Sequence, residues 1–421
     1  MLTYFFFLPE SIKNQCTVIS LENGHGKHQH FANNSMFDDD QNIKAIREGI
    51  KALCFKFPNE YWREKDRKRA YPAEFVKALS DQGYLGCLIP EEYGGSGLKL
   101  SAAAVILEEI HNSGGNGAAC HAQMYIMGTL LRHGSDEQKK RYLPGIAEGS
   151  LRLQAFGVTE PGNGTDTLAL KTTARKDGDS YIINGQKVWT SRAEHSDLML
   201  LLARTTHRDK VEKRTNGLSV FIVDMRGTIG KELTIRPIRT MVNHATTEVF
   251  FDELRVPQEN LIGEEGKGFR YIIDGMNAER ILIASECIGD SRWFIKKATA
   301  YANERIVFDR PIGMNQGIQF PIAQAYAETE AAALMTEKAA LLYEDEKRLG
   351  AEANVAKLLA SAASWKAAEA CMQTHGGYGF AEEYDVERKY RETRLYQIAP
   401  ISTNLILSYI AEHVLGLPRS Y

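Results

Sequence analysis

The stretch FGVTEPGNGTD, residues 156–166, decides how this chain is organised. It starts like a strand and breaks into a turn at the PGNG of residues 161–164, where glycine permits a tight backbone. It carries hydroxyls at Thr159 and Thr165 but no His, Cys or Lys, so it suits hydrogen bonding to a flat polar heterocycle better than nucleophilic catalysis or tight metal binding. Trp189, about two strands later, offers a face for stacking on such a ring. An ordinary hairpin connection is the alternative interpretation.

Strand signals surround this stretch from about residue 152 to 262. Residues 172–175 lead to a turn at Asp177-Gly178. Tyr181-Ile182-Ile183 then runs into Asn184-Gly185, and this pair predicts a hairpin turn. Further strand candidates lie at residues 172–175, 198–202, 218–223 and 248–251. The charged loop at residues 205–216 is expected to be exposed.

Helical patterns lie on both sides of these strands. Before them, apolar residues recur at helical spacing in residues 74–79 and 103–110, and a helix is expected to begin after Ser135. After them come three long segments rich in helix formers, at residues 271–300, 321–348 and 352–373. Helices and strands that are segregated in this way predict an α+β protein.

These changes of pattern divide the chain into four parts. We expect a disordered or non-native extension at residues 1–35, a helical domain at 36–152, a β-domain at 153–262 and a helical bundle at 263–421. The first part is rich in Asn, Gln and His and contains no Arg, and we hypothesise that Met36 is the biological start. Its histidines, at positions 25, 28 and 30, fit a disordered tail better than a weak metal cluster.

Composition narrows the function classes. The chain has 421 residues and a formal net charge of −3 from 51 basic and 54 acidic side chains, which argues against a nucleic-acid binder. Six scattered cysteines without CxxC spacing indicate neither a zinc site nor a disulfide framework, and favour a reducing, intracellular compartment. No apolar run approaches the ~20 residues of a membrane span, and no signal or transit peptide is evident. We therefore expect a cytoplasmic protein with no bound metal.

Glu279 is the carboxylate most suited to chemistry. It lies in an otherwise apolar helical segment, GMNAERILIA at residues 275–284, and apolar surroundings raise a carboxyl pKa toward that of a useful general base. Arg280 points about 100° away on a helix, so the two need not pair. Glu286, seven residues on and on nearly the same face, is the competing candidate. An exposed or structurally paired glutamate is the alternative for both positions.

Two further clusters follow in the C-terminal part. Glycines at 376, 377 and 379 come after Gln373 at a helix end, where they favour a helix C-cap over a backbone that approaches a pyrophosphate. The run RIVFDRPIGMNQ, residues 305–316, breaks a helix at Pro311. Arg305 and Gln316 are suited to a phosphate and a nucleotide edge, and a solvated basic turn is the alternative.

Taken together, these motifs resemble the acyl-CoA dehydrogenase family. The resemblance extends from about residue 45 to the C-terminus, with matches in the family order at residues 90–97, 158–166, 189–191, 305–316 and 373–380. It implies an N-terminal helical domain, a central β-sheet domain that is β-barrel-like, and a C-terminal four-helix bundle, with FAD between them. It also implies a homotetramer built as a dimer of dimers, and an electron-transferring flavoprotein as electron acceptor.

The resemblance also assigns roles to individual residues. The flavin ring would contact Phe156, Val158, Thr159, Trp189 and Ser191, and the same subunit's FAD would also meet Ser402 and Asn404. The FAD of a neighbouring subunit would meet Arg305, Phe308, Gln316, Gln373, Gly376 and Gly377. Coenzyme A would contact Thr165, Asn277 and Arg280.

The implied reaction is α,β-dehydrogenation of an acyl-CoA to the trans-2-enoyl-CoA, in which a glutamate takes the α-proton and flavin N5 takes the β-hydride. The common family base lies in a Y-E-G-T segment, but here Pro400 stands at that position. In isovaleryl-CoA and long-chain enzymes the base lies on the earlier helix in an x-x-E-R context, which Glu279 and Arg280 match. Glu279 is therefore the expected catalytic base.

Some alternatives stay open at this stage. The same fold supports flavin oxidases or oxygenases and non-catalytic members that bind acyl-CoA or FAD, and Pro400 removes a main-chain N–H that the family uses to polarise the thioester carbonyl. Ile401 would then have to donate in its place, or carbonyl activation would differ. Met124, Met127 and Leu130 line the acyl tunnel in one interpretation and belong to the plain core in the other.

Overall fold

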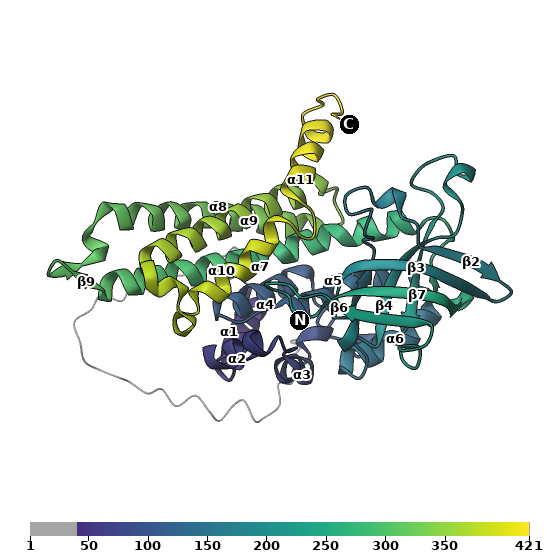
Figure 1. The fold of residues 1–421 in the computed structure, drawn as a ribbon, viewed down its shortest axis with the longest axis horizontal. Coiled ribbons are helices and arrows are strands. Elements are labelled where there is room, and N and C mark those ends of the chain that lie inside the picture. Colours follow the sequence, from purple (N-terminus) through teal and green to yellow (C-terminus); the bar gives the residue numbers. More distant parts are fainter. Residues whose placement is uncertain (1–39, 421) are drawn as a thin grey trace, which may run out of the picture. The chain divides into compact units, whose positions relative to one another are not determined.

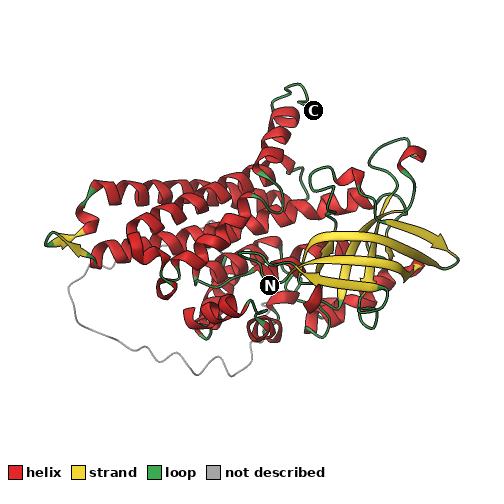
Figure 2. Ribbon diagram, in the orientation of Figure 1, coloured by secondary structure: helices red, strands yellow, loops and turns green. Residues whose placement is uncertain are grey.

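The computed structural model describes residues 40–420. The expectations for residues 1–35, including the three histidines and the start at Met36, lie outside the described residues. Figure 1 traces the order of elements, and Figure 2 shows strands gathered in one body next to the helices. This order of helices, strands and helices is the α+β organisation that the sequence predicts.

Among the described residues, six α-helices form the N-terminal part. They are α1 (Gln41–Phe55), α2 (Asn59–Lys68), α3 (Ala73–Asp81), α4 (Leu100–Asn112), α5 (Ala118–His133) and α6 (Asp136–Glu148). The helix start predicted after Ser135 is confirmed, because Ser135 and Gln138 cap each other reciprocally at the start of α6. Every residue of α4 is buried, since this helix packs between α1 and α7.

The middle of the chain is one mixed sheet. Its strands are β1 (Leu153–Gly157), β2 (Thr173–Asp177), β3 (Ser180–Ser191), β4 (Leu198–Arg204), β5 (Leu218–Asp224), β6 (Leu233–Pro237), β7 (Thr246–Pro257) and β8 (Leu261–Ile262). The order is β6-β7-β3-β2-β4-β5-β8, and β1 pairs with β4 in parallel. Within the described residues the edge strands β6 and β8 do not pair with each other, so the sheet is barrel-like but open.

The strand β4 explains how the sheet joins the helices. Leu198, Leu200 and Leu202 pack into the core that is shared with α5 and α7, whereas Met199 and Leu201 face a second core inside the curled sheet. Both faces are therefore buried, which accounts for the continuous apolar run of this strand.

The hairpin predicted at Asn184-Gly185 is wrong. The turn predicted at Asp177-Gly178 is confirmed, because it joins β2 to β3, whereas Asn184-Gly185 is a bulge inside the long strand β3. Gly185 is required there because a Cβ atom would come within 2.5 Å of the Thr172 hydroxyl. The Asn184 side chain bonds across the sheet to Glu253.

Long helices form the C-terminal part. They are α7 (Gly268–Glu304), α8 (Gln316–Glu344) and α9 (Gly350–His375), joined by the shorter α10 (Val386–Arg394) and α11 (Thr403–Tyr409). Between α7 and α8 lies a hairpin of two short strands, β9 (Ile306–Val307) and β10 (Arg310–Pro311). The helices α7, α8 and α9 pack on one another, and α10 packs on α9, which gives the four-helix bundle.

One negative finding concerns membranes. Within residues 40–420, no helix combines the length and the apolar composition needed to cross a bilayer.

Candidate active site

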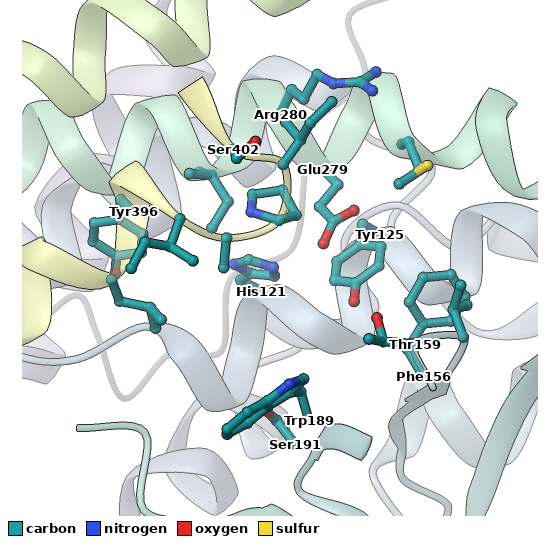
Figure 3. A pocket seen from close by; sticks show the side chains of 18 of the residues that line it. His121, Tyr125, Phe156, Thr159, Trp189, Ser191, Glu279, Arg280, Tyr396 and Ser402 are labelled. Carbon is teal, nitrogen blue, oxygen red and sulfur yellow. The ribbon is translucent and has the colours of Figure 1, made fainter. Parts of the chain in front are cut away.

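A cavity of about 1510 Å³ lies where the sheet meets α5, α7 and the segment before α11. Figure 3 shows its centre, where the Glu279 carboxylate points into the space that Trp189 and Ser191 border from the opposite side. A space of this size, with charged, polar and aromatic walls, is able to hold a large organic cofactor together with a substrate.

The structure brings most of the predicted site residues to this cavity. Those that line it are Phe156, Val158, Thr159, Thr165, Trp189, Ser191, Asn277, Glu279, Arg280 and Ser402. Asn404 follows Ser402 at the start of α11 but is not part of the lining. Residues from four separated stretches of the sequence therefore meet at one site.

The loop after β1 is held in place by a buried ion pair. The Lys187 ammonium, on β3, donates to the Val158 carbonyl at 3.0 Å and to the Glu160 carboxylate at 2.9 Å. Glu160 also accepts from the backbone N–H groups of Lys171 and Thr172. Burial lowers the pKa of Lys187 to about 8. This pair fixes the backbone that presents Val158 and Thr159 to the cavity.

Trp189 is turned toward the cavity by a second irregularity in β3. The register of β3 against β7 shifts between Lys187 and Thr190, and Trp189 has a φ of 60°, which is unusual for a side chain of this size. Its indole is 59% exposed. The backbone at Trp189 is therefore strained, and this strained conformation presents an aromatic face to the cavity.

The cavity wall fits the FAD that the family resemblance implies. Gln154, buried on β1, lines the cavity and leaves its amide Nε2 without a hydrogen-bond partner in the described residues. The Ser191 hydroxyl is held by the Asn243 amide at 2.7 Å. An unsatisfied donor, oriented hydroxyls and an open indole face are what a flat heterocycle with acceptor oxygens and nitrogens needs.

Glu279 has the environment expected of a base. It is 5% exposed, lines the cavity from α7, and has no partner for its Oε2 atom in the described residues. Burial raises the pKa of Glu279, although His121, Arg280 and the Tyr125 hydroxyl partly oppose this. Arg280 donates to Asn277 at 2.9 Å, and Figure 3 shows it pointing away from Glu279.

The segment around Pro400 borders the same cavity. Ala399, Pro400 and Ile401 all line it. The fully buried Lys357 on α9 donates to the Ile401 carbonyl at 2.9 Å, and burial lowers the pKa of Lys357 to about 8. Lys357 therefore anchors the segment around Pro400, which contains no carboxylate, to the helical bundle.

Glu286, the competing candidate, also lines the cavity and also has an Oε2 atom without a hydrogen-bond partner in the described residues, but its charged neighbours differ from those of Glu279. It is fully buried, and its Oε1 atom lies 3.0 Å from His121 Nδ1, while Oε2 lies 3.8 Å from His111. Burial alone would raise its pKa, but His121, His111 and Tyr396 outweigh burial, so the pKa of Glu286 lies below its usual range. Its charge is therefore stabilised, unlike that of Glu279.

Glu286 belongs to a buried ion cluster. Its members are Glu286, Asp290, His111, Lys389 and Glu392, which come from α4, α7 and α10. Lys389 lies 2.5 Å from Asp290 and 3.1 Å from Glu392. His111 bridges to Asp290 at 2.8 Å through Nδ1 and accepts the Gly117 N–H through Nε2.

Sequence reasoning missed the part of α5 that faces the cavity. Ala118, His121 and Tyr125 line the cavity, whereas Met124, Met127 and Leu130 are buried in the shared core. The interpretation of these three as acyl-tunnel residues is therefore wrong, and the plain-core alternative holds. The helical spacing of His121 and Tyr125, four residues apart, was the available signal.

The remaining predicted residues lie at the far end of the bundle. None of Arg305, Phe308, Gln316, Gln373, Gly376 and Gly377 lines the cavity. Phe308 is 93% exposed at the tip of the β9–β10 hairpin, and the Arg305 guanidinium lies 5.7 Å from the centre of the Tyr378 ring. Gly376 ends α9 with a φ of 57°, so the predicted glycine C-cap is confirmed.

Comparison with known protein families gives a consistent match over the described residues. Three models of the acyl-CoA dehydrogenase family match: the N-terminal domain at residues 40–150, the middle domain at 155–254 and the C-terminal domain at 266–415. The Mycobacterium bovis protein named acyl-CoA dehydrogenase fadE12 is 36% identical over 392 residues, which is 91% of this chain and 99% of that protein.

Solved structures agree. Glutaryl-coenzyme A dehydrogenase in its glutaryl-CoA complex matches with a TM-score of 0.83 at 32% identity, over 90% of this chain and 97% of that one. A chain from the structure of an electron transferring flavoprotein of Acidaminococcus fermentans matches with a TM-score of 0.83 at 29% identity, over 89% and 98% of the two chains.

Proposed function

This chain belongs to the acyl-CoA dehydrogenase family and is thus an FAD-dependent oxidoreductase that acts on acyl-CoA, and we propose that Glu279 is its catalytic base. The product would be the trans-2-enoyl-CoA. The observation that carries this proposal is the buried Glu279 carboxylate, which points into the cavity from α7. Pro400, at the usual position of the base, supports it by elimination.

The residues around the cavity divide the work. Glu279 takes the α-proton of the thioester and holds it on its carboxyl, and burial favours that protonated form. When bound, FAD supplies the acceptor for the β-hydride. Phe156, Val158, Thr159, Trp189 and Ser191 would hold the ring, and Ser402 and Asn404 would hold the rest of the cofactor.

Coenzyme A would lie beside the segment of α7 that carries Glu279. Asn277 and Arg280, on either side of Glu279, and Thr165, in the loop after β1, line the cavity, and we assign them to the coenzyme. Ile401 lines the cavity next to Pro400, and Lys357 holds its carbonyl. We propose that the Ile401 N–H polarises the thioester carbonyl, since Pro400 has no N–H to donate.

The assembly follows from the residues far from the cavity. We propose a dimer of dimers in which Arg305, Phe308, Gln316, Gln373, Gly376 and Gly377 contact the FAD of a neighbouring subunit. The exposed Phe308 at the hairpin tip supports such a contact. An electron-transferring flavoprotein is the proposed electron acceptor, and a bacterial cytoplasm is the proposed location, as its relatives include bacterial proteins.

Anaerobic titration of the FAD-loaded protein with a panel of acyl-CoAs tests the proposal. We expect the flavin absorbance to bleach and the trans-2-enoyl-CoA to form in equal amount. A protein that takes up no flavin, or a flavin that no acyl-CoA reduces, would contradict the proposal. Peroxide formed in air as fast as substrate is consumed would identify a flavin oxidase instead.

A further inference from the structure

Arg192 is a cavity residue that the proposed mechanism does not yet use. It comes directly after Ser191 at the end of β3 and has a φ of 63°, a left-handed conformation that is uncommon for a residue with a side chain. Its backbone N–H donates to the Ala245 carbonyl at 2.6 Å, just before β7. Arg192 is 9% exposed and lines the cavity. The turn after β3 therefore places a guanidinium in the cavity wall.

The guanidinium of Arg192 has few partners. It carries five N–H donors and no acceptor, and within the described residues its side chain makes one hydrogen bond, from Nη1 to the Asn243 amide oxygen at 3.3 Å. Its Nε atom is buried without a hydrogen-bond partner, and no ion pair joins it to a carboxylate in residues 40–420. A buried cation with unused donors is suited to negative charge or acceptor atoms on a bound molecule.

The titratable groups around Arg192 leave its charge largely uncompensated. Burial lowers the pKa of Arg192, and the neighbours that oppose this are Tyr125, Tyr71, Glu286 and Cys120. The tyrosines and the cysteine are uncharged near neutral pH, because burial raises the pKa of each. Glu286 has His121 and His111 as its closest charged or chargeable partners, at 3.0 and 3.8 Å. Since a guanidinium keeps its proton in proteins, this position carries a fixed positive charge.

One side chain links Arg192 to the wall that we assign to the flavin. Asn243 accepts from the guanidinium through its amide oxygen, and its amide nitrogen donates to the Ser191 hydroxyl at 2.7 Å. A single amide group therefore separates the positive charge from a hydroxyl that we assign to the ring. Trp189, assigned to the same ring, lies three residues earlier in the chain, within β3. Charges act strongly over such short separations in a buried site.

Building on the proposed function, we propose that Arg192 is a fixed cation beside the flavin, where it stabilises the negative charge that hydride transfer adds to the ring and so raises the reduction potential of the bound cofactor. In this reaction the α-proton neutralises the Glu279 carboxylate, and the β-hydride carries two electrons to the ring. One negative charge thus moves from Glu279 to the ring. Arg192 interacts more favourably with the reduced ring than with the oxidised ring, which is the condition for assisting the transfer.

The reduction potential of the bound flavin, measured without substrate by equilibration with reference dyes, tests the inference. The wild-type protein should have a higher potential than free FAD. Arg192→Gln should make the equilibrium constant for flavin reduction about 10- to 100-fold smaller, as expected for the loss of an interaction with a charged group. This corresponds to a potential that is about 30–60 mV lower. Arg192→Lys keeps the charge and should retain most of the wild-type potential.

Arg204→Gln is the matched control. Arg204, on β4 of the same sheet, is 7% exposed, and its guanidinium donates to the Leu168 and Leu170 carbonyls. It does not line the cavity. The substitution removes a guanidinium that is as deeply buried as that of Arg192 but lies outside the cavity wall, so the flavin potential should stay at the wild-type value.

A substrate comparison separates the flavin from the acyl group as the partner of Arg192. Anaerobic bleaching gives kcat/KM for a straight-chain acyl-CoA and for the same chain ending in a carboxylate. Arg192→Gln should lower both values by the same factor, because the proposed role concerns the ring and not the acyl group.

Several results would overturn the inference. A wild-type potential at or below that of free FAD would do so without any variant. Equal potentials in wild type and Arg192→Gln, with normal bleaching by acyl-CoA, would refute the role of Arg192 and leave the proposed function standing. An Arg192→Lys potential as low as that of Arg192→Gln would show that the charge is not what matters. A loss of kcat/KM confined to the carboxylate-bearing substrate, at unchanged potential, would place Arg192 at the acyl group instead. A protein that takes up no flavin refutes the proposed function itself.

Discussion

Two stretches of α7, only two turns apart, place the same residue type in opposite environments. At Glu279 the carboxylate faces the cavity and burial raises its pKa. At Glu286 the carboxylate meets His121 and His111, and its pKa is lowered. A carboxylate whose negative charge is incompletely compensated is suited to accept a proton as a base. A carboxylate whose charge is compensated has a structural or positioning role instead.

The difference between Glu279 and Glu286 also distinguishes a carboxylate that serves function from one that serves stability. The buried ion cluster ties α4, α7 and α10 together through charges that are compensated by partners. Glu279 contributes no comparable contact, and its burial as a charge is unfavourable. The two carboxylates should therefore respond in opposite directions to substitution and to pH.

The largest effect on stability is expected at Lys389. Lys389→Met removes the cation that lies against Asp290 and Glu392 and leaves both carboxylates buried, so the free energy of unfolding should fall by about 3–5 kcal/mol. Urea unfolding of the FAD-loaded protein measures this. Lys77→Met, which breaks the exposed pair with Asp81, is the control and should cost less than about 1 kcal/mol. Equal losses in the two variants would mean that the cluster does not stabilise the fold.

A smaller loss, with a defined pH dependence, is expected for Glu286→Gln. The folded-state pKa of Glu286 is lowered, so its stabilisation is present above the ordinary glutamate pKa and is lost as pH falls through the lowered value. The variant should be less stable than wild type by about 2–3 kcal/mol near neutral pH. This deficit should shrink in acid. Urea midpoints across pH measure it, and a deficit that grows in acid would contradict the assignment.

The smallest effect, of opposite sign, is expected for the stability of Glu279→Gln. The folded-state pKa of Glu279 is raised, so wild type carries a cost that is absent below the ordinary glutamate pKa and grows as pH rises to the raised value. Removal of the charge should therefore stabilise the protein by about 1–2 kcal/mol near neutral pH. The same urea series checks this, and a variant that is less stable than wild type at neutral pH would show that Glu279 is structurally paired.

The sequence was sufficient to predict the helices and strands and their order along the chain. The turn at residues 161–164, the helix start after Ser135 and the C-cap at Gly376 depend on local chemistry, which the sequence carries. The hairpin prediction at Asn184-Gly185 was wrong because the same dipeptide also suits a β-bulge. The close approach of Thr172 to Gly185 decides between a hairpin turn and a bulge. That approach is a tertiary contact with no local signal.

The two glutamates could not be told apart from local sequence alone. Both lie on one face of an apolar helix, and the resemblance to the family singled out Glu279. What distinguishes them physically is His121, which is 165 positions from Glu286 in the sequence, and His111, which lies farther away still. Partners that distant become visible only once α4 and α5 are packed on α7.

The rate of anaerobic flavin bleaching by acyl-CoA in Glu279→Gln, compared with Glu286→Gln and wild type, tests the central claim most directly. Glu279→Gln should keep its FAD and bleach at least about 10²- to 10⁴-fold more slowly, as expected for the loss of a general base, whereas Glu286→Gln should still bleach readily with an aliphatic acyl-CoA. Bleaching at the wild-type rate in Glu279→Gln, together with its loss in Glu286→Gln, would contradict the account and move the base to Glu286.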